Sequence, residues 1–209
     1  KFVIPDVMVK SKDGEFVLIL NDEEIPVLGI NPFFDELSGN TGKKNKKELN
    51  TFVNSSINNA KWFIQSIKRR NDTLVKVCRA IVEFQRDFFR RGPKYLIPLT
   101  LKDIARDVDV SEATISRITN GKYIQTEWGT YELKFFFSNS ISGSGSKGSR
   151  ISKQSAKVII QEIIEEEGKE KHLSDKRIAE ILETKGIKLA RRTVAKYRKE
   201  LDILSSYKR

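Results

Sequence analysis

Apolar residues recur every three or four positions through a long stretch in the first half of the chain. The pattern begins at Leu49, Phe52 and Val53 and continues to Phe89. Such spacing places the apolar side chains on one face of a helix. The pattern stops at residues 91–93, Arg-Gly-Pro, a combination that ends helices. We therefore predict two or three amphipathic helices that end near residue 91.

Residues 1–42 follow a different pattern. Two β-prone runs, residues 2–5 and 15–20, flank a turn signal at Asp13 and Gly14, and prolines and glycines interrupt the rest. Neither run is long enough to define a sheet domain. We expect this part to be irregular and partly extended, and the chain as a whole to be mainly α-helical.

Residues 101–121 fit a helix-turn-helix unit. In such a unit the two helices cross closely, and the second presents its outward face to the major groove of DNA. Ala105 is small enough for the crossing, and Ser111 is a suitable N-cap for the second helix. Asp109 stands in the turn where glycine is more usual, and aspartate tolerates the left-handed conformation better than most residues. A plain helical bundle remains the alternative interpretation.

The second helix of this unit has a distinct outward face, because Ile115 and Ile118 are its inward residues. Arg117 is the only basic side chain on that face and is the best candidate DNA contact of the unit. Thr114 and Lys122 are candidate contacts to phosphates. The outward residues are Glu112, Ala113, Ser116, Arg117 and Asn120, with Thr114 beside them.

The same arrangement returns in residues 173–201. Ser174 caps a first helix that contains the small residue Ala179, and Gly186 lies at the break. The second helix then has Val194, Tyr197 and Leu201 as inward residues. Finding the pattern twice strengthens both predictions.

The second helix of the second unit is strongly basic. Arg191 and Arg192 fall in its first turn, where cations oppose the helix dipole. An anionic partner explains this arrangement, and arginine at the groove entrance can bind O6 and N7 of guanine. A solvated basic helix face is the alternative. Residues 188–199 contain six basic residues and no acidic one: Lys188, Arg191, Arg192, Lys196, Arg198 and Lys199.

Charge and composition fit several small domains that bind a polyanion. The 209 residues include 39 Lys and Arg against 28 Asp and Glu, for a net charge of +11. The last 60 residues contain 16 of the basic and 10 of the acidic residues, which is more than half of the excess. Residues 143–149, Gly-Ser-Gly-Ser-Lys-Gly-Ser, have the composition of a flexible linker.

Composition also argues against several classes of protein. One Cys and one His cannot form a disulfide or a Cys/His metal site, and no apolar run approaches the roughly 18 residues that span a bilayer. We expect a cytoplasmic protein without cofactor, enzyme activity or membrane partner. A recombinase or transposase would need a nucleophile with Arg and His or clustered metal-binding carboxylates. A ligand-binding repressor would need a pocket in residues 1–91. Both remain weaker alternatives.

Residues 190–199, Ala-Arg-Arg-Thr-Val-Ala-Lys-Tyr-Arg-Lys, resemble the ten-residue signature box of the sigma-54 (sigma-N) class of bacterial RNA polymerase sigma factors. They depart from it only at Lys199, where glutamate is more usual. Residues 60–89 and 103–137 carry two further resemblances to the same family, so the likeness covers most of the chain.

The resemblance implies four regions. They are a helical region that binds core RNA polymerase (1–91), a helix-turn-helix region near the downstream minus-12 promoter element (92–142), the flexible linker (143–149), and a small three-helix, homeodomain-like domain that reads the upstream minus-24 GG element (150–209). Such factors hold polymerase in a closed complex until an ATP-driven AAA+ activator remodels it. The family's Gln-rich activator-interacting region has no counterpart in this sequence, so we expect it to be absent.

The DNA-binding residues expected from the two units and from the resemblance are polar or basic, apart from one tyrosine. They are Lys188, Arg191, Arg192, Thr193, Lys196, Tyr197 and Arg198 in the second unit and Thr114, Ser116, Arg117 and Lys122 in the first. Aromatic side chains could stack on unpaired bases, but we expect core packing for Phe135, Phe136, Phe137, Trp62 and Trp128. Cys78 should be a buried, inert thiol.

Overall fold

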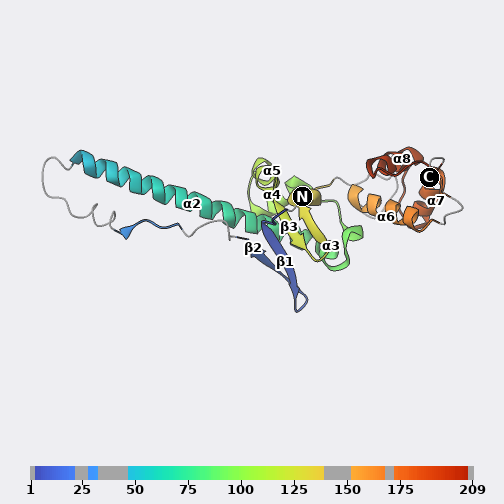
Figure 1. The fold of residues 1–209 in the computed structure, drawn as a ribbon, viewed down its shortest axis with the longest axis horizontal. Coiled ribbons are helices and arrows are strands. Elements are labelled where there is room, and N and C mark those ends of the chain that lie inside the picture. Colours follow the sequence, from blue (N-terminus) through green and yellow to red (C-terminus); the bar gives the residue numbers. More distant parts are fainter. Residues whose placement is uncertain (1–2, 22–27, 33–46, 139–151, 168–171, 207–209) are drawn as a thin grey trace.

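A computed structural model describes residues 3–21, 28–32, 47–138, 152–167 and 172–206. The predicted linker, residues 143–149, lies outside these ranges. The described residues form two bodies, a larger one that carries a long helix and a smaller helical one at the C-terminal end (Figure 1).

The helices predicted up to residue 91 are one long helix, α2 (Lys47–Phe84), and one short helix, α3 (Arg86–Arg91). Gln85 between them is fully buried, and its side-chain amide donates to the carbonyl oxygen of Ile97 at 2.9 Å and accepts the Ile97 N–H at 3.0 Å. Gly92, with φ 99°, ends α3, and Pro93–Tyr95 form the short helix η2. The predicted end of the helical stretch is therefore confirmed.

The N-terminal half of α2 projects from the larger body, whereas its C-terminal half is buried in it (Figure 1). Phe52, Trp62 and Phe63 are 68%, 67% and 56% exposed. The prediction that Trp62 packs in the core is wrong, because the core of this body covers α2 only from Leu74 onward.

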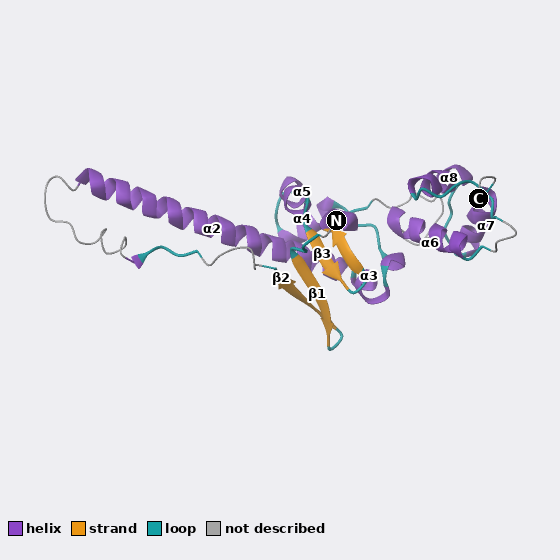
Figure 2. Ribbon diagram, viewed as in Figure 1, coloured by secondary structure: helices purple, strands orange, loops and turns teal. Residues whose placement is uncertain are grey.

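A four-stranded sheet ties the N-terminal segment to the helix-turn-helix region (Figure 2). β1 (Val7–Lys12) and β2 (Glu15–Leu20) form one hairpin, and β3 (Tyr123–Thr126) and β4 (Gly129–Glu132) form another. The strand order is β2-β1-β3-β4, with β1 and β3 parallel.

The sheet corrects our expectation that the β-prone runs would not define one. The second run, residues 15–20, is β2, but the first strand is β1, Val7–Lys12, and the described residues 3–5 of the first run lie outside it. The strands can be short, because β1 pairs with β3 and both hairpins then belong to one four-stranded sheet. Asp6, just before β1, makes the junction: it accepts the Tyr123 N–H on Oδ2 at 2.9 Å, across 117 residues of sequence. Its own N–H donates to the Tyr123 carbonyl at 2.9 Å. The chain is mainly helical, as predicted, but a sheet organises the larger body.

One hydrophobic core holds this body together, and its members run from Val7 to Phe136. It joins the sheet and α2 to α4 (Leu101–Val108), α5 (Glu112–Thr119) and η3 (Leu133–Phe136). The predicted division at residue 91 therefore passes through a shared core. The assignment of residues 1–91 to polymerase binding and of residues 92–142 to DNA binding stays a prediction.

Aromatic rings make up much of this core. Phe88 and Phe136 are fully buried and meet edge to face, with centroids 5.0 Å apart. Phe135 and Phe137 pack against the same core, as expected. Core packing was also expected for Trp128, but Trp128 lies at the surface of this core, 44% exposed, with its indole N–H donating to the Phe89 carbonyl at 3.0 Å.

The smaller body consists of α6 (Lys153–Glu165), α7 (Asp175–Thr184) and α8 (Arg191–Glu200). Its separate core contains Ile160, Ile178, Leu182 and Val194, all fully buried. This is the three-helix arrangement predicted for the C-terminal domain.

The two bodies touch where α6 packs on η2. Lys94 and Glu162 form an ion pair at 2.7 Å, and the Ser155 hydroxyl donates to the Lys94 carbonyl. A cleft of about 400 Å³ beside this contact is lined by residues such as Tyr95, Ile97 and Ile159.

Candidate nucleic-acid interface

The C-terminal helix-turn-helix is built by local signals in the sequence. The Ser174 hydroxyl caps α7 by accepting the Arg177 N–H at 3.3 Å. Gly186, with φ 80°, allows the chain to turn after α7, since positive φ favours glycine. Val194 and Tyr197 then pack α8 into the core with its opposite side outward.

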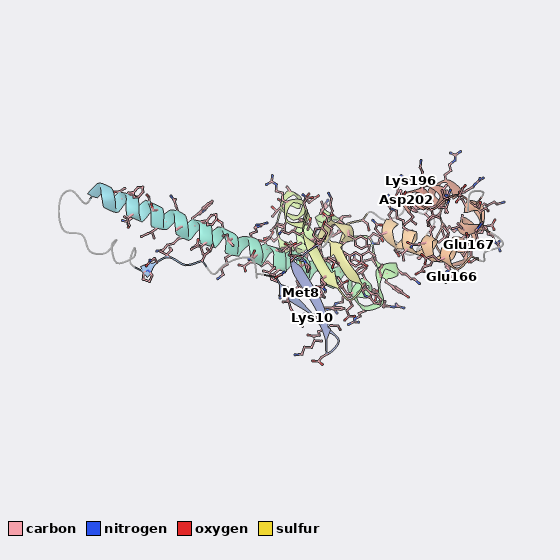
Figure 3. The ribbon with its side chains drawn as sticks, in the orientation of Figure 1. Met8, Lys10, Glu166, Glu167, Lys196 and Asp202 are labelled. Carbon is pink, nitrogen blue, oxygen red and sulfur yellow. The ribbon has the colours of Figure 1, made fainter. Side chains whose placement is uncertain are left out.

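The outward side of α8 presents cations that have no acidic partner among the described residues. Arg191, Arg192 and Lys196 are exposed. Lys196 lies on the far side of the C-terminal body from Glu166 and Glu167 in Figure 3. Arg192 and Lys196 are four residues apart and therefore share one helix face. This face can attract a polyanion over its whole length.

The start of α8 is also open to an anion. Its N-cap is Ala190, which provides no side-chain hydrogen bond, and its first turn contains no acidic residue. The first backbone N–H groups of a helix lack intrahelical acceptors and favour negative charge. A phosphate or a base edge can therefore approach this end between Arg191 and Arg192.

Two residues that we predicted to contact DNA, Tyr197 and Arg198, lie on the inner side of α8 in the structure. Tyr197 is only 7% exposed and sits in the core with Val194. The Arg198 side chain is 11% exposed and binds Asp175 through Nε–Oδ1 at 2.8 Å and Nη2–Oδ2 at 3.3 Å. Its Nη1 also donates to the Ile203 carbonyl at 2.7 Å. Helix periodicity explains this burial, since Tyr197 and Arg198 follow Val194 by three and four residues and so lie on the same side of α8. Their contact with DNA stays a prediction.

Thr193 and Lys188 flank the outward face. Thr193 is half-buried, and Lys188 is exposed with its Nζ 3.8 Å from Glu183 Oε1, a weak surface pair.

A second charged cluster, which the sequence did not reveal, closes the far end of α8. Glu200 binds Lys157 at 2.8 Å and Lys153 at 2.9 Å, both from α6. Hydrogen bonds from Lys157 and then Lys153 lower the pKa of Glu200 from 4.5 to about 2. The one carboxylate of α8 is thus neutralised by α6.

The first helix-turn-helix has the predicted caps and turn. Thr100 and Asp103 form a reciprocal capping box at the start of α4, and Ser111 caps α5. Asp109 adopts the left-handed conformation with φ 56° in the turn. Ile104 and Ile115 are fully buried between the helices.

The predicted contacts of this unit differ in accessibility. Ser116 and Arg117 are exposed on α5. The Thr114 hydroxyl is 2.9 Å from the Ser111 hydroxyl and takes part in the cap. Lys122 pairs with Asp6 at 2.5 Å and is half-buried, so its charge is already compensated within the protein.

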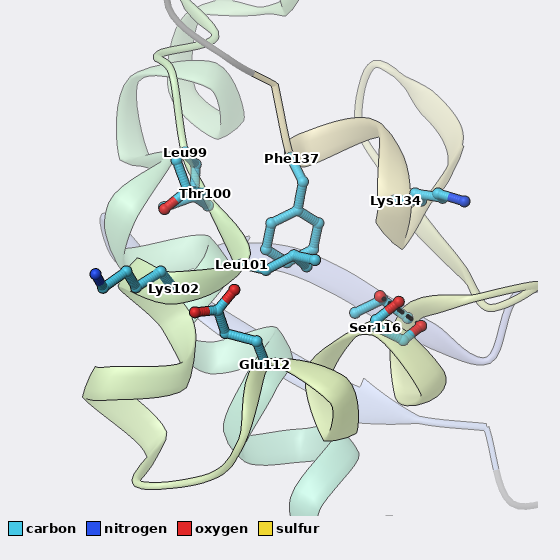
Figure 4. A pocket seen from close by; sticks show the side chains of 9 residues that line it. Leu99, Thr100, Leu101, Lys102, Glu112, Ser116, Lys134 and Phe137 are labelled. Atoms are coloured by element: carbon cyan, nitrogen blue, oxygen red, sulfur yellow. Dashed lines mark hydrogen bonds between the residues drawn. The ribbon is translucent and has the colours of Figure 1, made fainter.

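A shallow cleft of about 350 Å³ lies beside α5 (Figure 4). Ser116 and Glu112 line it from α5, and Lys102, Lys134 and Phe137 line it from neighbouring elements. Arg117 is not among its lining residues, so the predicted contact lies outside this cleft.

Other chemistry has little support in the described part of the chain. Burial, followed by the nearby Asp6 carboxylate, raises the pKa of the Cys78 thiol to about 12, which makes it an inert thiol at neutral pH. The described residues contain no group of three or more metal-ligating side chains. None of the described helices is long and apolar enough to cross a membrane.

Comparison with known proteins agrees with this geometry. The family described as "Sigma-54, DNA binding domain" matches residues 50–209. RNA polymerase sigma-54 factors of Pseudomonas putida and Escherichia coli are 43% and 40% identical to this chain over all 209 residues. The chain spans 41% and 43% of the length of these relatives.

A solved structure is also similar. The crystal structure of Aquifex aeolicus sigmaN bound to promoter DNA aligns with a TM-score of 0.59 and 34% identity, covering 100% of this chain and 60% of that one. The family match includes both helix-turn-helix units and the part of α2 from residue 50 onward. From the family match and these relatives we conclude that this chain belongs to the sigma-54 family of RNA polymerase sigma factors.

Proposed function

We propose that this chain recognises promoter DNA for a bacterial RNA polymerase. The observation that carries the proposal is the outward face of α8, where Arg191, Arg192 and Lys196 are exposed and lack acidic partners among the described residues. This helix is the second of a helix-turn-helix, the element that enters the major groove. Its first turn meets the base edges, and arginine there binds guanine in a bidentate manner.

Each helix-turn-helix unit reads one of the two promoter elements. α8 reads the upstream minus-24 GG element through Arg191 and Arg192. α5 approaches the downstream minus-12 element with Ser116 and Arg117. Because α5 offers one exposed cation on its outward face and α8 offers several, the C-terminal unit supplies most of the electrostatic affinity.

Core RNA polymerase is the second proposed partner, and residues 1–91 are its proposed binding region. These residues expose apolar side chains that no described element covers, including Val17 (42%) and Ile19 (36%) on β2. Opening of the promoter then depends on an AAA+ activator, as the resemblance implies. The Gln-rich region for that activator has no counterpart in residues 1–209, and the chain has no catalytic role in this scheme.

Competition binding tests the proposal. The full chain is titrated against a duplex that contains the GG element and against a random duplex of equal length, at one stated salt concentration. We expect at least a 10³-fold preference for the promoter duplex, the lower end for specific DNA binding. Equal affinity for both duplexes would contradict promoter recognition.

A further inference from the structure

Lys199 occupies the same outward face of α8 as the proposed base-reading residues. It follows Lys196 by three residues and Arg192 by seven, so the three side chains form one row along the helix. Val194 and Tyr197 hold the opposite face in the core. Lys199 is exposed, and no described acidic side chain pairs with it.

The charged residues on either side of Lys199 are committed to internal contacts. Arg198 is bound by Asp175, and Glu200 is bound by Lys153 and Lys157. Of these three consecutive charges, only that of Lys199 is available to a ligand. The ion pairs of Glu200 with α6 also compensate the negative charge next to Lys199 in the sequence, whereas Asp202, three residues after Lys199, is an exposed carboxylate.

The length of α8 decides what Lys199 can reach. The helix rises 1.5 Å per residue, so Lys199 lies about 10 Å along the axis from Arg192. The major groove is about 12 Å wide and is bordered by phosphates. If the first turn of α8 meets base edges, its last turn lies at the border of the groove. A lysine there meets the sugar-phosphate backbone, for which its compact charge is suited.

We propose that Lys199 binds a backbone phosphate of the DNA at the C-terminal end of α8. This inference rests on the proposed function, because it takes α8 as the helix in the groove. A lysine in the last turn of a helix also interacts favourably with the helix dipole. The experiment must therefore separate phosphate binding from helix stabilisation.

The test measures how the affinity of the full chain for DNA depends on salt. Each phosphate contact contributes about −0.9 to the slope of log K against log salt concentration. We expect Lys199→Gln to make the slope shallower by about 0.9 on the promoter duplex and on a random duplex alike. Raising the salt concentration from 50 to 200 mM should therefore weaken DNA binding by Lys199→Gln about 3.5-fold less than it weakens binding by the unmodified chain.

Lys185→Gln is the matched control. Lys185 is exposed in the same body but lines the cleft that faces η2. We expect it to leave the slope unchanged. An unchanged slope in Lys199→Gln, with or without a lower melting temperature, would overturn the inference, as would an equal change in Lys185→Gln. Failure of the unmodified chain to prefer the promoter duplex would instead contradict the proposed function.

Discussion

Arg198 lies within the signature box and is bound inside the C-terminal body, so we predict that its main role is to stabilise this body. Its guanidinium makes two hydrogen bonds to Asp175 and a third to the Ile203 carbonyl. We predict that Arg198→Met destabilises this body, because it leaves the Asp175 carboxylate without its partner in a largely covered site.

The expected magnitude follows from burial. Removing one partner of a buried ion pair costs about 3–5 kcal/mol. The two side chains are 11% and 19% exposed, so water compensates part of this loss. We expect a loss of about 2–4 kcal/mol. A body of this size has a free energy of unfolding of roughly 3–9 kcal/mol. The variant should therefore unfold far more often than the unmodified chain.

Native-state hydrogen exchange of the full chain measures this change where it occurs. Amides of α6, α7 and α8 should lose protection, and amides of α4 in the separate core should keep theirs. A double variant, Arg198→Met with Asp175→Leu, should recover most of the protection, since an apolar pair of similar volume replaces a buried ion pair at little cost. Unchanged protection in Arg198→Met, combined with lost affinity for the promoter duplex, would show that Arg198 contacts DNA and would refute our reasoning.

Two further predictions concern Glu200 and β2. The pKa of Glu200 is lowered from 4.5 to about 2, so its stabilising contribution is complete above about pH 4.5 and disappears as the pH falls toward 2. Thermal unfolding followed from pH 2 to 6 should show this loss, and Glu200→Gln should flatten it; an equally steep profile in the variant would contradict the assignment. Val17→Thr with Ile19→Thr keeps β-branched residues on β2 but removes apolar surface. It should weaken retention on core polymerase in a pull-down while leaving DNA affinity unchanged, and undiminished retention would show that polymerase binds elsewhere.

Local signals made both helix-turn-helix units predictable from the sequence. Ser111 and Ser174 cap their helices, and Ala105 marks a crossing, through interactions within a few residues. The turn signal at Asp13 and Gly14 is local and indicates the hairpin of β1 with β2. The pairing of β1 with β3 was not predictable in this way, because Asp6 and Tyr123 at this junction are 117 residues apart in the sequence. The sheet therefore emerged only from the structure.

The candidate site shows the same difference between local and distant interactions. The exposure of Arg191, Arg192 and Lys196 follows from helix periodicity. The role of Arg198 depends on Asp175, 23 residues earlier, and no spacing rule connects the two. The burial of Tyr197 was predictable, since its spacing of three residues from Val194 places it on the inward face. We nevertheless also counted it among the DNA contacts, because it lies in the signature box.

The central claim is that α8 reads guanines in the upstream element, and a double-mutant cycle between protein and DNA tests it most directly. Affinities of the full chain and of Arg192→Ala are measured on the promoter duplex and on duplexes in which one guanine of the GG element is replaced. We predict that Arg192→Ala costs about 1–3 kcal/mol on the promoter duplex and that replacing its guanine costs the variant little more. Equal losses for Arg192→Ala on promoter and random duplexes, with the guanine replacement still costing the variant its full effect, would contradict base reading by Arg192 and leave it as a phosphate contact.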